Sequence, residues 1–329
     1  MELAAIVRYG CGGAQAVTVS AQRCRRLIGV CLIVNVATAS AASAQSPPES
    51  TTATRTVSTA ERPQTDEDDD AVLSPAEPDF VVVNLPTGMR LPLFKGNFRL
   101  THRFAGNLKR GTFSQQASNL FGIDQGAIIG FEYRFAVARH VQASFYRSSF
   151  DKTIQLHGKY DAVRQRRSMP VSMSALASIE GTDNFQEKYA PSIGVVVSRI
   201  VGTRIAAYLT PIWTDNTAAS LDAIAHDHDH DEHSATDERP HVQHSTTVLG
   251  VGGRVRVGGT TYVAAEIVPR VSGYAPDEPA YGVSIEKRVG AHVFSLTFTN
   301  MFGTTFAQVA RGGATSTLYL GFNLGRKFY

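Results

Sequence analysis

The chain has 329 residues, with 32 Lys and Arg against 29 Asp and Glu, and three cysteines. All three cysteines lie in the first 44 residues, so the rest of the chain has no disulfide framework, no thiolate metal site and no cysteine nucleophile. Those 44 residues also hold four arginines and one acid, which leaves 28 charges of each sign in the remainder. The basic excess therefore belongs to the leader, and the sequence gives no indication of nucleic-acid binding.

Residues 1–44 have the pattern of a cleaved secretory signal peptide. Basic residues up to Arg26 precede the apolar run 27–39, which is too short for a membrane span of about 20 residues. Small residues follow as far as Ala44, after which we expect cleavage. The leader predicts export across the inner membrane of a Gram-negative bacterium.

Residues 45–79 are rich in Ser, Thr, Pro and acidic residues, including the acidic run 66–70. Apolar residues are too sparse to offset the entropy of ordering this stretch, so we expect a disordered periplasmic tail. The acidic run suits a solvated linker better than a site for a cation or for a basic periplasmic partner. The barrel domain is accordingly expected from residue 80 to residue 329.

The barrel domain has no apolar run long enough for a transmembrane helix, and its short segments alternate apolar and polar residues. Between Phe131 and Phe135, for example, aromatic residues alternate with Glu132 and Arg134. A period of two gives a strand one apolar and one polar face. The expected strands are 94–104, 126–135, 141–150, 153–160, 170–180, 192–200, 203–213, 246–257, 260–270, 280–289, 292–301 and 315–328.

The connections between these strands distinguish a membrane barrel from a soluble β-sandwich. With the first strand starting on the periplasmic side, mostly long gaps follow odd strands and mostly short turns follow even strands, as in outer-membrane barrels. One pair departs from this rule, because gap 151–152 is short and gap 161–169 is long. A miscounted hairpin there would change the strand number. We predict an all-β fold, an antiparallel transmembrane β-barrel of about 12 strands (range 10–14), with a disordered N-terminal tail.

The last predicted strand ends in Phe328 and Tyr329. An alternating terminal strand with an aromatic end is typical of barrels that the outer-membrane assembly machinery inserts into lipid. Phe328 continues the apolar row, so we expect Tyr329 to point inward or to overhang the strand. The predicted partners are therefore outer-membrane lipid and the barrel-assembly machinery, besides a periplasmic partner for the tail.

Several short motifs lie between residues 94 and 329 and are densest in the first half of that range. They are His102-Arg103-Phe104-Ala105-Gly106, Leu120-Phe121-Gly122-Ile123-Asp124, Gly130-Phe131-Glu132-Tyr133, the run from Arg147 to Thr153, Gly158-Lys159-Tyr160 and Gln165. With these motifs the chain resembles an uncharacterised family of bacterial outer-membrane β-barrels, often encountered beside small periplasmic lipocalin-like proteins. The resemblance implies a membrane barrel and implies no activity.

The polar faces of the predicted strands carry more basic than acidic residues. The inward set is Lys95, Arg99, Arg103, Arg134, Lys159, Arg204, Arg254, Arg256, Arg270, Arg288 and Lys327 against Glu132, Glu266 and Glu286. A basic lumen would favour anions, which predicts a narrow, anion-preferring channel for small solutes. Alternatively, Arg–Glu networks fill the interior and leave a closed structural barrel that displays its loops. A soluble periplasmic β-protein is the third interpretation.

The most conspicuous sequence feature is the predicted loop 215–245, which contains six of the ten histidines. Its candidate metal ligands are His226, His228, His230, His233, Asp227, Asp229 and Asp231. Imidazole and carboxylate groups together suit a divalent Zn, Cu or Ni ion. The alternation fixes no tetrahedral spacing, so a solvated surface loop is the competing interpretation.

No arrangement of residues predicts an enzyme. His and Asp are adjacent only in the His-rich loop, where nothing rigid would hold a base beside a nucleophile. The glycines at 250–253 lie within a predicted strand and lack the helix that a phosphate-binding loop requires. We therefore expect no catalytic residues and no cofactor other than the metal ion considered above.

Overall fold

The computed structural model describes residues 74–217, 244–274, 278–314 and 316–329. Within these ranges, no helix is both long enough and apolar enough to cross a membrane.

Thirteen strands and a few short helices make up the described part of the chain. The strands are β1 Gly96–Asn107, β2 Ala127–Ala138, β3 Val141–Ser148, β4 Ile154–Val163, β5 Ser172–Thr182, β6 Glu187–Val201, β7 Ile205–Thr214, β8 Thr246–Arg256, β9 Thr261–Val268, β10 Arg270–Gly273, β11 Ala280–Val289, β12 His292–Thr299 and β13 Tyr319–Phe328. The helices are α2 Phe113–Ser118 and α4 Phe306–Arg311, with 3-10 turns η1 Leu120–Gln125 and η2 Phe150–Lys152.

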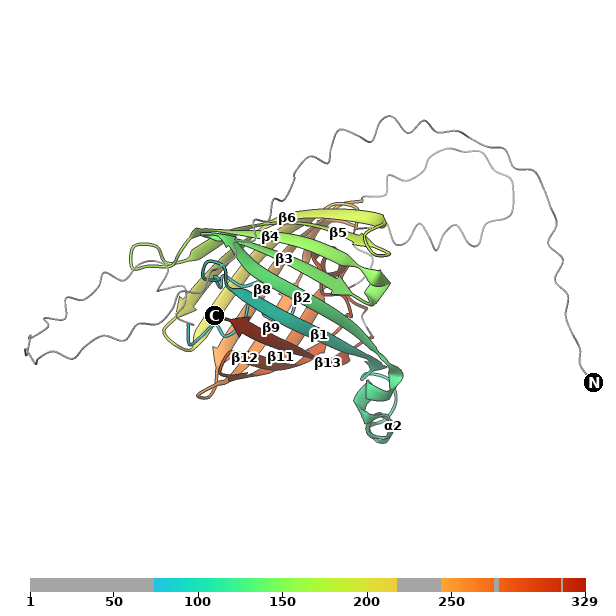
Figure 1. The fold of residues 1–329 in the computed structure, drawn as a ribbon. Coiled ribbons are helices and arrows are strands. Elements are labelled where there is room, and N and C mark those ends of the chain that lie inside the picture. The colour runs from blue at the N-terminus through green and yellow to red at the C-terminus, as the bar shows by residue number, and fades with distance from the viewer. Residues whose placement is uncertain (1–73, 218–243, 275–277, 315) are drawn as a thin grey trace, which may run out of the picture. The chain divides into compact units, whose positions relative to one another are not determined.

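The strands form one closed antiparallel sheet, in which β1 pairs with both β2 and β13 (Figure 1). β9 and β10 are two parts of a single stave, the word used here for one strand position in the barrel wall. Both pair with β8, and only Pro269 separates them. Proline has no N–H for the ladder and interrupts the strand there, while its carbonyl still accepts from Leu249. The wall therefore has 12 staves, which confirms the predicted fold class and strand number.

The two ends of the barrel differ as the sequence predicted. At one end, here called the turn end, short connections join β2 to β3, β6 to β7, β8 to β9 and β11 to β12. Longer connections lie mostly at the opposite loop end, where α2 extends beyond the strands (Figure 1). The β5–β6 connection at that end is an exception, because it spans only 183–186 and not the predicted 181–191. The exceptional pair is also present, with a short link 149–153 and a longer link 164–171, so no hairpin is miscounted.

Side chains alternate between the two faces of the wall with the predicted phase. On β2, Phe131 and Tyr133 are 49% and 48% exposed, whereas Glu132 and Arg134 are buried. Exposed apolar side chains recur on the outer face of most other staves, which gives the wall an apolar outer surface. At the C-terminus Phe328 lies on this outward row and Lys327 is buried on the inside.

The stretch before β1 differs from the prediction. Residues 80–95 belong to no strand, and most of them are buried, as are Ala76, Glu77 and Asp79. Assigning residues up to Asp79 to a disordered tail is therefore wrong for 74–79. Composition misled the prediction here, because the polar groups of this stretch are satisfied by contacts with distant strands. Residues 1–44 and 45–73 lie outside the described residues.

Replacing Ile285 by Arg tests the orientation of the wall in lipid. Ile285 lies at the middle of the outer face of β11, where an arginine should lower the free energy of unfolding by about 2–4 kcal/mol. Val289→Arg, equally outward but at the turn end of the same strand, is the matched control and should cost about 0–1 kcal/mol. Urea unfolding of barrels folded into phospholipid vesicles measures both. Equal losses would contradict a lipid-facing outer surface.

Candidate functional site

Residues 74–95, here called the inner segment, fold into the barrel from the turn end. Its tip is a tight turn in which Val82 N–H donates to Leu85 O at 2.8 Å, and a second bond, from Thr87 N–H to Phe80 O at 2.9 Å, joins the two arms. Both arms run back to the turn end: Lys327 of β13 donates to Pro78 O, and Phe94 N–H donates to Ala136 O of β2. The segment is therefore a hairpin that occupies the barrel interior.

Glu266 of β9 holds the tip of this hairpin. Its buried carboxylate accepts the backbone N–H groups of Val83, Asn84 and Leu85 at 3.0, 2.9 and 3.0 Å. Three successive N–H groups directed at one anion make charge-assisted hydrogen bonds, which are stronger than bonds between neutral groups. The carboxylate thereby satisfies backbone donors that the tight turn leaves unpaired.

Basic wall residues hold the arms through backbone carbonyls. Arg254 forms a two-point ion pair with Glu286 at 2.7 and 3.0 Å, and the same guanidinium donates to Val81 O at 2.6 Å. Lys159 pairs with Asp161 at 3.1 Å and donates to two carbonyls of the returning arm. Each of these wall cations thus has an acidic partner on the wall and a further bond to the inner segment.

Glycines in the wall make room for the apolar side chains at the tip. A Cβ added at Gly282 would lie 2.9 Å from Val83 Cγ1, and one added at Gly250 would lie 2.7 Å from Leu85 Cδ1. Side chains at these strand positions would therefore collide with the tip. The inner surface of the wall and the hairpin are complementary in shape as well as in hydrogen bonding.

A third group of charges lies on β1 and β2. Glu132 accepts from Arg99 at 2.9 Å and from Arg134 at 2.7 Å, and all three side chains are buried. The guanidinium of Arg134 also lies 5.3 Å from the ring centre of Phe80 in the inner segment. In the segment itself, burial raises the pKa of the Glu77 carboxyl.

The β12–β13 connection fills the interior from the loop end. It contains α4, whose N-terminal Thr305 hydroxyl and Ala307 N–H both donate to the buried Glu180 of β5. Phe306 of α4 packs edge-on against His157, with ring centres 5.0 Å apart. One apolar cluster joins the two inserted segments and the wall, and it comprises Val82, Leu85, Leu176, Val196, Ala206, Tyr208, Ile212, Val248, Ala264, Val268, Ala280, Met301, Phe306, Val309 and Ala310.

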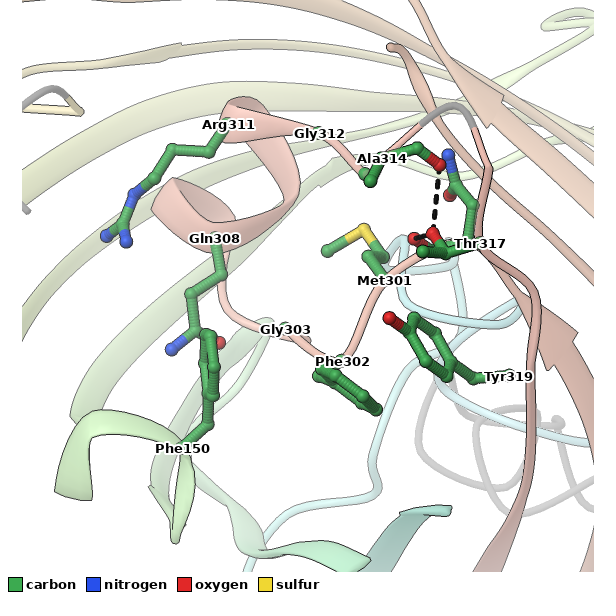
Figure 2. Close-up of a pocket in the computed structure, with 12 residues that line it drawn as sticks. Phe150, Met301, Phe302, Gly303, Gln308, Arg311, Gly312, Ala314, Thr317 and Tyr319 are labelled. Carbon is green, nitrogen blue, oxygen red and sulfur yellow. Dashed lines mark hydrogen bonds between the residues drawn. The ribbon is translucent and has the colours of Figure 1, made fainter. Parts of the chain in front are cut away.

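A pocket of about 260 Å³ lies at the loop end between α4 and the neighbouring connections (Figure 2). Phe302 and Tyr319 form an aromatic side with ring centres 3.9 Å apart, and Phe150 lies next to it. Gln308 and Arg311 of α4 supply polar groups on another side (Figure 2). The pocket combines aromatic surface with a cation and a side-chain amide.

The structure places nine of the fourteen predicted interior residues among the buried side chains. They are Arg99, Arg103, Glu132, Arg134, Lys159, Arg254, Glu266, Glu286 and Lys327. Arg103 donates to Asn323 at 2.8 Å and to Asn84 of the inner segment at 3.2 Å. Three others, Arg256, Arg270 and Arg288, are half-buried, and Arg256 donates to carbonyls of the β8–β9 turn.

The predicted excess of eleven basic over three acidic wall residues is too large. In the described residues, six basic and five acidic wall side chains are buried, and Glu77 and Asp79 of the inner segment add two buried acids. Lys95 and Arg204 were counted as interior but are exposed at the turn end. Asp161 and Glu180 were missed, although Asp161 continues the inward row of Gln155 and Lys159 by one step beyond the predicted end of the strand. Extending that alternation by one residue pair would have found it.

Residues 218–243 of the His-rich loop lie outside the described residues. They include its seven candidate ligands His226, His228, His230, His233, Asp227, Asp229 and Asp231. In the part of the chain that the structure describes, no group of three or more His, Cys, Asp or Glu is arranged to hold a metal ion. Metal binding at the loop stays a prediction. The structure does bring Ser144 Oγ to 3.3 Å from His157 Nδ1, a contact that the sequence did not indicate. Both side chains are buried, and Phe306 packs against the histidine ring.

Replacing Arg254 by Met tests the buried ion pair. The substitution leaves Glu286 buried without its cation and removes a bond to Val81, so we expect the free energy of unfolding to fall by about 3–5 kcal/mol. Denaturant unfolding in vesicles measures the loss. The double variant Arg254→Met, Glu286→Leu should recover most of it, because it leaves no unpaired charge. A loss below about 1 kcal/mol for the single variant would contradict the importance of the pair.

A family model described as "Membrane bound beta barrel domain (DUF5777)" matches residues 81–328, which is more than half of the chain. The comparison with curated proteins returned no match.

Several solved structures are similar in fold. The outer membrane protein Omp33 of Acinetobacter baumannii is 10% identical, with a TM-score of 0.37 over 71% of this chain and 98% of that chain. The NanC porin is 5% identical, with a TM-score of 0.42 over 71% and 99%. Outer membrane phospholipase A from Escherichia coli is 8% identical, with a TM-score of 0.40 over 78% and 98%. Similarity at this level implies nothing about the activity of this chain.

Proposed function

Since the chain belongs to the family of membrane-bound β-barrel domains called DUF5777, we propose that it is a gated outer-membrane channel whose resting state is closed by the inner segment. The observation that carries the proposal is the hairpin itself. It is no part of the β-sheet, yet it occupies the interior and binds the wall through Glu266, Arg254 and Lys159. Moving it requires no break in the ladder of strands.

The ion pairs of Arg254 and Lys159 within the wall do not depend on the hairpin. Arg254 keeps Glu286 and Lys159 keeps Asp161 when their bonds to the segment are lost, so these cations do not become unpaired. An interior lined by charged and polar side chains tolerates water, whereas a wholly apolar one would not. The solutes are accordingly small and polar. Without Glu77 and Asp79 of the segment, the buried wall charges described here are six basic and five acidic, which supports a weak anion preference.

Placement in the outer membrane is part of the same proposal. The predicted leader, the long loops at one end and the outward row that ends at Phe328 support it, as they support insertion by the barrel-assembly machinery. In that orientation the turn end and the inner segment face the periplasm, and the loop-end pocket faces the cell exterior.

A permanently closed barrel that displays its loops is the second candidate. The apolar cluster between the inner segment and α4 favours it, because separating the two segments exposes Val82, Leu85 and Phe306 to water. In that case the loop-end pocket would be the functional surface (Figure 2).

A reversible cross-link distinguishes the two candidates. With cysteines at Val83 and Gly282, the Cβ atoms would lie about 3.3 Å apart, close to the range of a disulfide. For a gated channel we expect brief openings of the wild-type barrel in planar bilayers, silence of the oxidised double variant, and recovery on reduction. The reduced double variant and the single variant Val83→Cys, which adds no side chain at Gly282, are the controls. Openings that persist in the oxidised variant would refute gating by the hairpin.

Deleting residues 74–91 completes the test. The deletion should convert brief openings into long-lived conductance steps with a weak preference for anions, read from the reversal potential in a salt gradient. Folding is checked first by heat-modifiable migration on gels. If the deleted barrel conducts while the wild-type barrel never opens at any voltage, the closed display barrel is the correct function.

A further inference from the structure

A small internal cavity of about 20 Å³ lies where the inner segment approaches the connection that carries α4. Its lining residues are Val81, Asn84 and Pro86 of the inner segment, Thr304 and Phe306 of the β12–β13 connection, and Arg99, Glu132, Arg134, Tyr146, Gln155 and His157 of the wall. A cavity of this size holds one or two water molecules or one small ion.

Hydrogen-bond donors predominate around this cavity. Arg99 and Arg134 each use one nitrogen to reach Glu132, while Nη1 of Arg99 and both Nε and Nη1 of Arg134 are buried without a partner among the described residues. His157 is in the same situation, since Ser144 faces its Nδ1 and its Nε2 is buried and unpartnered. A buried donor without an acceptor is costly, and more so when it carries charge.

The charge around the cavity is not balanced either. Glu132 neutralises one of the two guanidinium groups, and both of its oxygens are already engaged. The charge of the nearby Lys159 is neutralised by its ion pair with Asp161. Glu180 accepts hydrogen bonds from Gln155 and from the start of α4. One positive charge of the Arg99–Glu132–Arg134 group is left over.

We propose that this cavity binds a monovalent anion of about the size of chloride. Such an ion accepts hydrogen bonds from the arginine and histidine nitrogens and balances the remaining positive charge. With a Ser144 hydroxyl proton donated to Nδ1, His157 presents its own N–H from Nε2. Water is a poorer occupant, because its two hydrogens need acceptors and the carboxylate of Glu132 is already shared. Phosphate and sulfate are too large for the space.

The ion would stabilise the closed interior, since residues of both inserted segments complete its cavity. This role does not depend on conduction: a barrel that never opens still requires a counter-charge at this place. The proposal of halide binding and the proposal of channel gating are therefore tested independently, and either one is able to fail without the other.

Halide-dependent unfolding of the full-length barrel in vesicles tests the proposal. Sodium bromide is exchanged for sodium gluconate at constant ionic strength, and the urea midpoint is followed. We expect a saturable rise with bromide concentration. Glu132→Gln removes the competing negative charge and should tighten apparent bromide affinity about tenfold, whereas a purely structural role for Glu132 predicts no gain. Glu187→Gln, an exposed acid at the start of β6 that does not line the cavity, is the control and should leave the affinity unchanged.

Anomalous diffraction from crystals grown in bromide gives a direct reading that needs no variant. A bromide peak within hydrogen-bonding distance of Arg99, Arg134 and His157 is the expected result. Density without anomalous signal means that water fills the cavity, and it overturns the proposal. A non-saturable midpoint change, equal in wild type and Glu132→Gln, does the same, because it reports general salt effects.

Discussion

Closure of the sheet between β1 and β13 is the constraint on which the rest of the structure depends. It gives the backbone of every strand a hydrogen-bonded neighbour on both edges, which a strand in lipid requires. It also divides the side chains into an apolar outer set and a polar inner set. The inner set is then confined to a space with little water. Every charge in it needs a partner, and the partners come either from a neighbouring stave or from a segment inserted into the interior.

The two inserted segments meet this need in different ways. The inner segment presents mainly backbone groups, so it offers carbonyls to Arg254 and Lys159 and N–H groups to Glu266. The α4 connection offers a helix start to Glu180 and apolar side chains to the segment. Together they convert a polar tube into an interior with its own apolar core. That core explains why barrel residues such as Val248 and Ala264, which point inward, are apolar.

Much of this architecture was predictable, because the alternation of side chains is a local property. The phase between Phe131 and Arg134 followed directly from the sequence, and so did the strand number and the unequal connections. The hairpin was not predictable in the same way. Its apolar run at 80–85 has neither strand nor helix period, and its conformation depends on Glu266, more than 180 residues away in the chain.

Alternation also reveals the face of a residue but not its depth. Lys95 and Arg204 have the inward phase and lie in water at the turn end, whereas Asp161 lies deeper than the predicted strand end suggested. Electrostatic arguments from sequence are sensitive to such errors: eleven basic and three acidic wall groups were predicted, and six basic and five acidic ones are buried among the described residues. The separate clusters of hydrogen bonds and ion pairs around Glu132, Glu266 and Glu286 follow from the pairing registers of neighbouring strands, which the sequence does not give.

The contacts of the inner segment are unequal in what its departure would leave behind. Arg254 and Lys159 retain acidic partners on adjacent strands, so their loss is limited to one or two bonds each. Glu266 takes its three backbone bonds from the tip alone, and removing the tip leaves the carboxylate without all three of them. The stability of the closed state is therefore concentrated at the tip, and a solute that supplies donors to Glu266 would compete with the hairpin for the same place.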